Sequence, residues 1–188
     1  MPKRTAAEAS FDSQQVEGSA TSKKLKTGSD NLVGKVNGLR PEDFRSTYVK
    51  EDWLHYQPRG LPLLFDVDSV AADDLKASDF DACFNHVETT SRSDYEASNQ
   101  GWRPRNKRRE MKDHDMHYLL VRQLHPRQTP IESVSDVCGF LSFMVTHDST
   151  PAVPALYVYE IHLSNRLQGI GLGAHLLGVA ENLSLIHI

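Results

Sequence analysis

The chain has 188 residues, of which 39% are hydrophobic and 24% are charged, and its formal net charge is −4. This length suits one domain with a substantial core, and the composition excludes collagen-like and disulfide-scaffold proteins. The apolar runs are too short for a transmembrane helix, and the N-terminal Met-Pro-Lys-Arg is not followed by the apolar stretch of a secretory signal. We therefore expect a soluble intracellular protein whose two cysteines, Cys83 and Cys138, are reduced.

The N-terminal segment differs in charge from the rest of the chain. Residues 1–40 carry seven Lys or Arg and four Asp or Glu, a net charge of +3, whereas residues 41–188 carry fourteen and twenty-one, a net charge of −7. Residues 1–40 lack helical or strand periodicity, which predicts a disordered basic tail. Its cluster Lys23-Lys24-Leu25-Lys26 fits a nuclear import signal and a solubilising tail equally well.

Helical patterns dominate the next part of the chain. Pro41-Glu42-Asp43-Phe44 predicts the start of a helix, because proline suits the first turn and acids favour the positive end of the helix dipole. Leu61–Asp68 predicts a first strand. Ser78 can cap a helix whose apolar positions run to Val87 and place Cys83 on the buried face. A second helical piece is predicted over Ser93–Asn99 and ends before Gly101.

The second half of the chain reads mainly as strands. The basic run Arg103–Lys112 predicts a solvated helix face. Strands are predicted over His117–Leu124, Val137–Val145 and Ala155–Leu163, with proline-containing turns between them. An amphipathic helix is predicted over Gly171–Leu183. Three consecutive strands favour an antiparallel meander, so the predicted fold class is mixed α/β (α+β), a mostly antiparallel sheet flanked by helices.

The stretch Gln168-Gly169-Ile170-Gly171-Leu172-Gly173 lies between a predicted strand and a predicted helix. Glycines allow a ligand to approach the backbone, and the N-terminus of the following helix offers free N–H groups to a pyrophosphate. A Rossmann site is excluded because the glycine spacing differs and too little chain follows. A P-loop is excluded because no Gly-Lys-Ser/Thr follows.

The Gln-x-x-Gly-x-Gly pattern of Gln168, Gly171 and Gly173 resembles the acetyl-CoA loop of the GNAT acetyltransferases. The strand Leu156–Leu163, with its Tyr-x-Tyr-Glu motif, resembles the NatD type, the histone-specific N-terminal α-acetyltransferases. The order Asp94-Tyr95-Glu96, Gly101-Trp102, Lys107–Met111 and Tyr118-Leu119 also resembles that type. The likeness covers about residues 60–183.

The resemblance implies a GNAT fold and transfer of acetyl from acetyl-CoA to an α-amine, with no metal. The implied general base is Glu160, and Tyr159 would protonate the leaving thiolate or line the peptide site. The implied peptide pocket is formed by Tyr95, Trp102, Tyr157 and Asp148. The implied acetyl-CoA site consists of Ile161, His162, Leu163, Gln168, Gly169, Ile170, Gly171, Leu172, Gly173 and Ala174.

The resemblance also implies the partner and the location. The substrate would be the N-terminal serine of histone H4 and of the core histone that shares its Ser-Gly-Arg-Gly start, and the enzyme would be a monomer in nucleus and cytoplasm. No membrane or direct nucleic-acid contact is expected. The net charge of residues 41–188 suits a basic tail.

The chain departs from the family at its end. A GNAT domain continues with further strands after the glycine-loop helix, so residues 41–183 would form an incomplete domain, a C-terminally truncated member of the family whose last strands are missing. Residues 184–188 do not resemble the family and are interpreted as an atypical, foreign C-terminus. The alternatives are therefore another GNAT acyltransferase acting on lysine or a small amine, or a non-enzymatic fragment.

Two sequence patterns that contain histidine each allow a functional and a structural interpretation. His162 lies two residues after Glu160 and would share its face in a regular strand, which makes it an alternative base or a structural histidine. His114-Asp115-x-His117 has the spacing of metal ligands but lacks a fourth ligand, so a surface turn is the expected reading.

Overall fold

A computed structural model of the chain describes residues 28–99, 101–124, 136–148 and 153–187. The predicted loop at Pro126 and Pro130, the turn at Pro151 and the Lys23–Lys26 cluster lie outside these residues. Five strands form one sheet in the order β1-β2-β3-β4-β5, and every neighbouring pair is antiparallel. The strands are β1 (His55–Tyr56), β2 (Leu64–Ala71), β3 (Met116–Leu124), β4 (Val137–Asp148) and β5 (Val153–Leu163).

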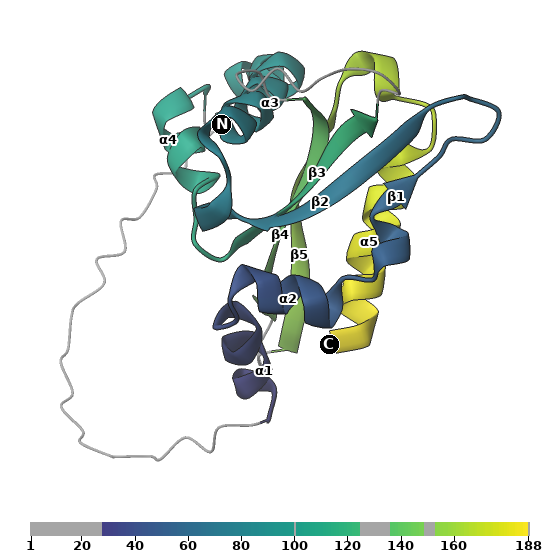
Figure 1. The fold of residues 1–188 in the computed structure, drawn as a ribbon. Helices are drawn as coiled ribbons and strands as arrows, with labels where there is room; N and C mark the ends of the chain where they lie inside the picture. The colour runs from purple at the N-terminus through teal and green to yellow at the C-terminus, as the bar shows by residue number, and fades with distance from the viewer. Residues whose placement is uncertain (1–27, 100, 125–135, 149–152, 188) are drawn as a thin grey trace, which may run out of the picture.

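Helices cover both faces of this sheet (Figure 1). The first face packs against α1 (Gly28–Asn37), α2 (Pro41–Tyr48) and α5 (Leu172–His187), and the second against α3 (Ala77–Ala97) and α4 (Pro104–Glu110). Short 3₁₀ turns occupy Glu51–Trp53, Ala72–Asp74 and Asn165–Leu167. The predicted fold class, a mixed α/β domain with a mostly antiparallel sheet flanked by helices, is confirmed.

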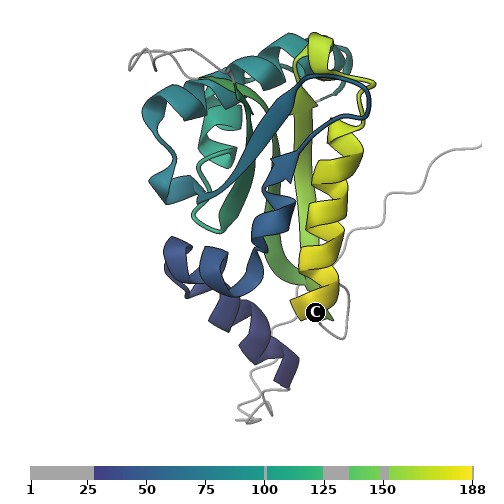
Figure 2. The same ribbon diagram turned by 45° about the vertical axis from the view of Figure 1, so that its right-hand side comes forward.

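The core divides between the two faces because successive strand residues point to opposite sides. Leu119 and Leu141 belong to the cluster under α1, α2 and α5, whereas Tyr118, Leu120 and Phe140 belong to the cluster under α3. The central strand β3 is buried on both sides, which explains its nearly continuous apolar run. Figure 2 shows α5 running alongside β5 on the first face.

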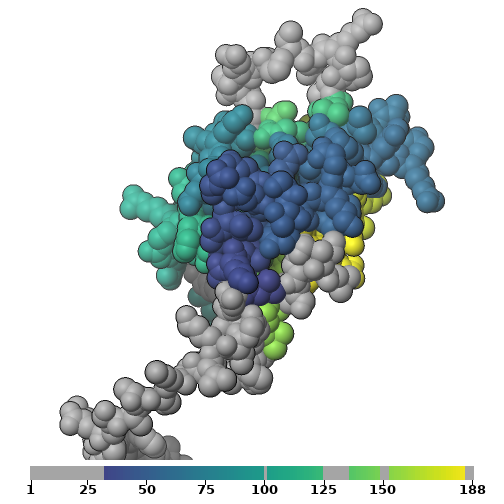
Figure 3. All heavy atoms as spheres, turned by 60° about the horizontal axis from the view of Figure 1, so that its bottom comes forward, coloured from purple at the N-terminus to yellow at the C-terminus, as the bar shows by residue number. Residues whose placement is uncertain are grey.

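Helix α1 corrects the predicted extent of the disordered tail. Residues 28–37 form a helix, and its Val33 and Val36 are buried in the core. In Figure 3 the purple residues of the N-terminal helices lie against the body of the domain, and α2 contacts α5. The helical, core-forming part of the chain therefore includes residues 28–37, which were predicted to belong to the tail, and residues 1–27 lie outside the described part.

The bounds of other elements also differ from the predicted ones. The two predicted helices over residues 78–99 are one continuous helix, α3, and the first predicted strand lies three residues later, as β2. Cys83 is buried, as expected, and Cys138 is buried too; both are free thiols. Leu177, an apolar residue within the predicted amphipathic helix, is exposed. Among the described residues, no helix combines the length and apolar character needed to cross a membrane.

The buried ring of His117 predicts an acid-sensitive fold. It stacks on Phe44, at 4.3 Å, and on Phe143, at 5.3 Å between ring centroids. Burial lowers the pKa of His117 to about 4, against a smaller opposing effect of Asp115. Because the unfolded chain binds the proton more tightly, the stabilisation is complete above the ordinary imidazole pKa and is lost as the pH falls toward 4.

We expect this one group to remove about 3 kcal/mol of unfolding free energy between about pH 7 and pH 4. Urea unfolding of the wild type and of His117→Phe at both pH values measures it, since phenylalanine keeps the stacked ring and cannot take up a proton. The variant should lose less stability on acidification. Equal losses in the two proteins would contradict the assignment.

Candidate active site

The candidate site begins at an irregularity in β5. Ser142 pairs with Glu160 and Phe143 pairs with Val158, so Tyr159 is an extra residue on β5 without a partner on β4. Such a β-bulge breaks the alternation of the strand and re-aims side chains. As a result Tyr159 and Glu160, although adjacent in sequence, both approach Lys107 of α4 on the second face of the sheet.

Glu160 is held in a buried ion pair. Lys107 Nζ lies 2.5 Å from Glu160 Oε1 and also contacts Glu110, and the side chains of Lys107 and Glu160 are only 5% and 10% exposed. Tyr95 donates a long hydrogen bond to Glu160 Oε1, at 3.5 Å. The second oxygen, Glu160 Oε2, is buried and has no hydrogen-bond partner among the described residues. It is therefore the acceptor that a proton donor would satisfy.

These contacts fix the charges at the site. Burial raises the pKa of Glu160, but the contacts with His162 and Lys107 outweigh it and leave the pKa below its usual value. Burial lowers the pKa of Lys107, but the hydrogen bonds to Glu110 and Glu160 raise it above its usual value. Burial, with the nearby Glu110 carboxylate, raises the pKa of Tyr159 to about 12. Near neutral pH the glutamate and the lysine are charged and the tyrosine carries its proton.

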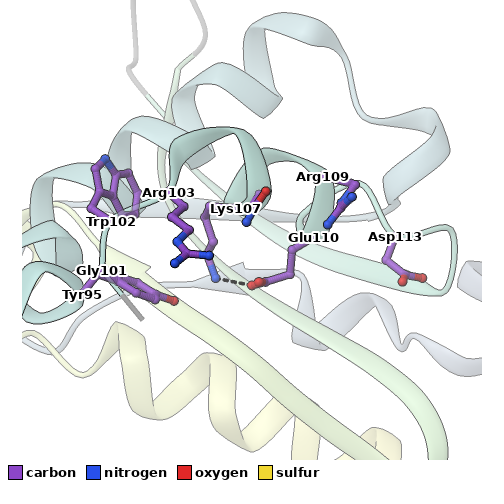
Figure 4. Close-up of a pocket in the computed structure, with 9 residues that line it drawn as sticks. Tyr95, Gly101, Trp102, Arg103, Lys107, Arg109, Glu110 and Asp113 are labelled. Atoms are coloured by element: carbon purple, nitrogen blue, oxygen red, sulfur yellow. Dashed lines mark hydrogen bonds and ion pairs between the residues drawn. The ribbon is translucent and has the colours of Figure 1, made fainter. Parts of the chain in front are cut away.

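An open hollow of about 630 Å³ lies beside this pair (Figure 4). Tyr95 and Trp102 form one end with their rings 5.5 Å apart, and Glu110 reaches Lys107 near the middle. The hollow brings together two of the predicted peptide-pocket residues, both aromatic. Its lining consists of Tyr95, Gly101, Trp102, Arg103, Asn106, Lys107, Arg109, Glu110 and Asp113.

The other predicted peptide-pocket residues lie elsewhere. Tyr157 is 57% exposed and packs edge-to-face against Tyr159, at 5.8 Å between ring centroids. Asp148 is the last residue of β4 and pairs with Val153. It lies six residues beyond Ser142, about 20 Å along the strand. The structure therefore does not place Asp148 at the hollow.

The outer edge of β5 offers backbone groups. Ser164 N–H donates to the Cys138 carbonyl, so this pair is a hydrogen-bonded one. Antiparallel pairs alternate, so the backbone groups of Ile161 and Leu163 point away from β4. No described strand pairs with that edge. These N–H groups are therefore available to an acyl carbonyl or an extended amide chain.

The glycine loop adjoins the same edge. Gly169 and Gly171 have positive φ angles of 77° and 89°, and the first bond of α5 runs from His175 N–H to the Gly171 carbonyl. The N–H groups of Leu172, Gly173 and Ala174 at the helix N-terminus therefore lack intrahelical partners and can hold a phosphate. A Cβ on Gly173 would lie 3.6 Å from Leu163 Cδ1, which shows how closely the loop abuts β5.

Tyr56 fixes the conformation of this loop, and the sequence analysis did not identify it. Its hydroxyl donates to the Ile170 carbonyl at 2.7 Å and occupies the space that a Cβ on Gly171 would need. Its ring stacks on His175 at 4.8 Å. Gln168, in turn, donates weakly to the Leu163 carbonyl at 3.3 Å, so it braces the loop. A tyrosine 114 residues before its partner leaves no local sequence signal.

Gly171→Ala should therefore disturb the loop, whereas Gly173→Ala should not. At Gly171 an L-residue has to adopt positive φ, which costs about 1–2 kcal/mol, and its Cβ collides with the Tyr56 hydroxyl. At Gly173 the added methyl makes ordinary contacts within a helix, so thermal stability should be kept or raised. We expect Gly171→Ala to weaken acetyl-CoA binding at least about tenfold in titration calorimetry. A tenfold loss of affinity corresponds to ~1.4 kcal/mol, which lies within the cost of the positive φ angle.

Gly173→Ala is the matched control for loop geometry. A loss of acetyl-CoA binding in this stable variant would report the close approach of a ligand to the backbone at Gly173. Unchanged affinity in Gly171→Ala would show that the loop conformation does not serve binding.

The structure does not bring the two histidines of the predicted pattern together at one site. His117 is buried against the rings of Phe44 and Phe143, whereas His114 is exposed. Asp113, His114 and Asp115 do bring one ligand atom each within 4.8 Å of one another, but as mostly exposed groups in a turn. His162, predicted at the acetyl-CoA site, turns its buried side chain toward α3, so only its backbone lies on β5 beside the loop.

No protein-family model matches the chain. Solved structures that resemble it include an aminoglycoside acetyltransferase from an uncultured soil metagenomic sample in complex with trehalose, 14% identical over 62% of this chain and 67% of that chain, with a TM-score of 0.40. A ribosomal-protein-alanine N-acetyltransferase from Brucella melitensis biovar Abortus 2308 is 13% identical over 65% of this chain and 74% of that chain, also with a TM-score of 0.40. At these values the likeness carries no weight for function, which rests on the geometry and the residue pattern.

Proposed function

We propose that this chain belongs to the GNAT superfamily and transfers acetyl from acetyl-CoA to an amine. The observation that carries the proposal is the bulge at Tyr159. It sets the buried carboxylate of Glu160 on one side of a strand whose free edge, at Ile161 and Leu163, adjoins the glycine loop on the other side. A cofactor held by the loop and the edge would present its acyl group beside the acid-base group.

Each part has a task that the reaction requires. The α5 N-terminus and Gly169–Gly173 hold the pyrophosphate, since both supply backbone N–H groups without steric hindrance. The outward N–H groups of Ile161 and Leu163 bind the pantetheine arm and polarise the acetyl carbonyl. Tyr159 carries its proton near neutral pH and so can donate it to the leaving thiolate.

Glu160 acts as the base through its unpartnered oxygen. Because Oε2 is buried, a proton reaches it from a water or from an amine that enters the hollow lined by Tyr95 and Trp102. The ammonium of Lys107 keeps the carboxylate ionised. An α-amine has an ordinary pKa of about 7.7–8.0, so the energy needed to deprotonate it is small.

For the substrate we propose the α-amine of a protein that begins Ser-Gly-Arg-Gly, as in histone H4, which places the chain in nucleus and cytoplasm. The support is the family-like residue pattern and the net charge of −7 over residues 41–188. The hollow itself presents Arg103 and Arg109 beside Glu110 and Asp113, so attraction for a basic tail comes from the wider surface.

Mass spectrometry of peptides treated with acetyl-CoA tests the proposal. A Ser-Gly-Arg-Gly peptide with an internal lysine should gain one acetyl group on its α-amine, and the same peptide with a blocked N-terminus should gain none. Acetylation of the lysine alone would contradict the proposed α-amine substrate and indicate a side-chain amine instead. No transfer to either peptide or to a small amine, together with no acetyl-CoA binding, would indicate a non-enzymatic chain.

A further inference from the structure

His162 forms part of a buried chain of polar groups that the reaction above does not use. Its Nδ1 lies 2.6 Å from Thr90 Oγ1 on α3, and its Nε2 lies 3.9 Å from Glu160 Oε1. The ring of Phe140 packs beside it at 5.3 Å. The His162 side chain is 9% exposed, so its hydrogen bonds are set by the protein.

The hydroxyl of Thr90 fixes which nitrogen of His162 carries a proton. Thr90 Oγ1 lies 2.8 Å from the backbone carbonyl of His86 and 2.6 Å from His162 Nδ1. A carbonyl oxygen can only accept, so the single hydroxyl hydrogen of Thr90 goes to His86. Thr90 Oγ1 must then accept a hydrogen from Nδ1–H, and the neutral ring keeps its lone pair on Nε2.

That lone pair faces the oxygen of Glu160, which is itself an acceptor. Two acceptors side by side are stabilised when a proton lies between them. Nε2 and Oε1 lie 3.9 Å apart, beyond hydrogen-bond distance while neither atom carries a proton. The arrangement is therefore ready to take up one proton at Nε2.

We propose that His162 is a positioning residue that stores the proton which Glu160 removes from the amine, and this inference rests on the proposed function. The N–H bond of the substrate ammonium breaks, Glu160 passes the proton on, and a new Nε2–H bond forms. The imidazolium is held by Thr90 Oγ1 on one side and the Glu160 carboxylate on the other. After attack, Tyr159 donates its proton to the thiolate and takes up the second proton of the former amine, and the imidazolium returns its proton to solvent.

The neighbours of Glu160 explain why a second group is needed. Lys107 and Tyr95 both stabilise the ionised carboxylate, so Glu160 holds a transferred proton only briefly. His162 Nε2 offers a second proton acceptor beside that carboxylate. The groups that face the pair from all packed elements are Thr90, Tyr95 and the His86 carbonyl on α3, Lys107 and Glu110 on α4, Phe140 and Ser142 on β4, and Tyr159 on β5.

The tautomer gives a test that does not depend on activity. Long-range nitrogen–proton NMR spectra of the whole protein should show His162 protonated at Nδ1 at high pH. The Nδ1–H tautomer should persist in Thr90→Ser, which keeps the hydroxyl oxygen that accepts from Nδ1–H. It should be lost in Thr90→Val, which has the same shape as threonine but no hydroxyl. An Nε2–H tautomer in the wild type would overturn the proposal.

The pH profile gives the second test. The pH dependence of kcat/KM of the wild type should contain a step that His162→Gln lacks, while the limb caused by the substrate amine stays in both proteins. We expect a loss of about tenfold or more in kcat with little change in the KM for acetyl-CoA. An unchanged profile in His162→Gln overturns the storage role. If the wild type acetylates no amine, the proposed function is refuted. The tautomer measurement then decides by itself whether Thr90 and His162 are arranged as described.

Discussion

Replacing Lys107 by methionine is expected to cost about 3–5 kcal/mol of unfolding free energy. Methionine keeps the length of the aliphatic chain but removes the ammonium that neutralises Glu160, whose side chain is 10% exposed. A buried carboxylate without its cation pays its desolvation penalty in full. Glu110, which also contacts Lys107, would add like-charge repulsion.

Urea unfolding of Lys107→Met, Glu160→Gln and the double variant measures this coupling. The double variant should be more stable than the sum of the two single losses predicts, by about 1–3 kcal/mol, because it leaves no unpaired charge. Lys76→Met is the matched control, since Lys76 is exposed. It should change stability by less than about 0.5 kcal/mol. Strict additivity in the cycle would contradict a coupled pair.

Lys107 also shows where the sequence misleads. The basic run Arg103–Lys112 predicts a solvated helix face, and this is wrong at Lys107, which is 5% exposed. Its main partner, Glu160, lies 53 residues later in the sequence, on a strand, so no local sequence pattern predicts the contact. Only the sheet register and the bulge at Tyr159 bring the two together.

Elements with a clear period were predicted best. The strands β3, β4 and β5 and the helix α5 carry regular apolar patterns, and each was found within a few residues of its expected bounds. Helix α1 was missed because its local sequence is polar and glycine-containing. Its contribution to the core comes from two valines, Val33 and Val36, which stabilise it by tertiary packing.

Helix α3 was divided in two for a similar reason. Its middle holds Thr89, Thr90 and Ser91, which have low helix propensity. In the structure the hydroxyls of Thr89 and Thr90 bond the carbonyls four residues earlier, and the helix continues. The same continuity places Tyr95 at the hollow and Thr90 beside His162, and only the second of these contacts was not predicted.

Glu160→Gln is expected to slow acetylation of the amine by about 10²–10⁴-fold. Glutamine fills the same volume but cannot accept a proton at the buried position of Oε2. The glycine loop and the outward backbone of β5 do not involve this side chain. The Kd for acetyl-CoA should therefore stay within about twofold of the wild type, ~0.4 kcal/mol, in calorimetry.

Glu110→Gln is the control that removes a carboxylate from Lys107 without removing the proposed base. Glu110 is the other carboxylate that contacts Lys107, and this variant leaves Glu160 and its Oε2 unchanged. It should slow the reaction far less than Glu160→Gln, by about tenfold at most. Equal losses in the two variants would mean that Glu160 acts only by holding Lys107. An unchanged rate in Glu160→Gln would remove the carboxylate from the reaction and leave the imidazole of His162 as the buried base that β5 brings to this face.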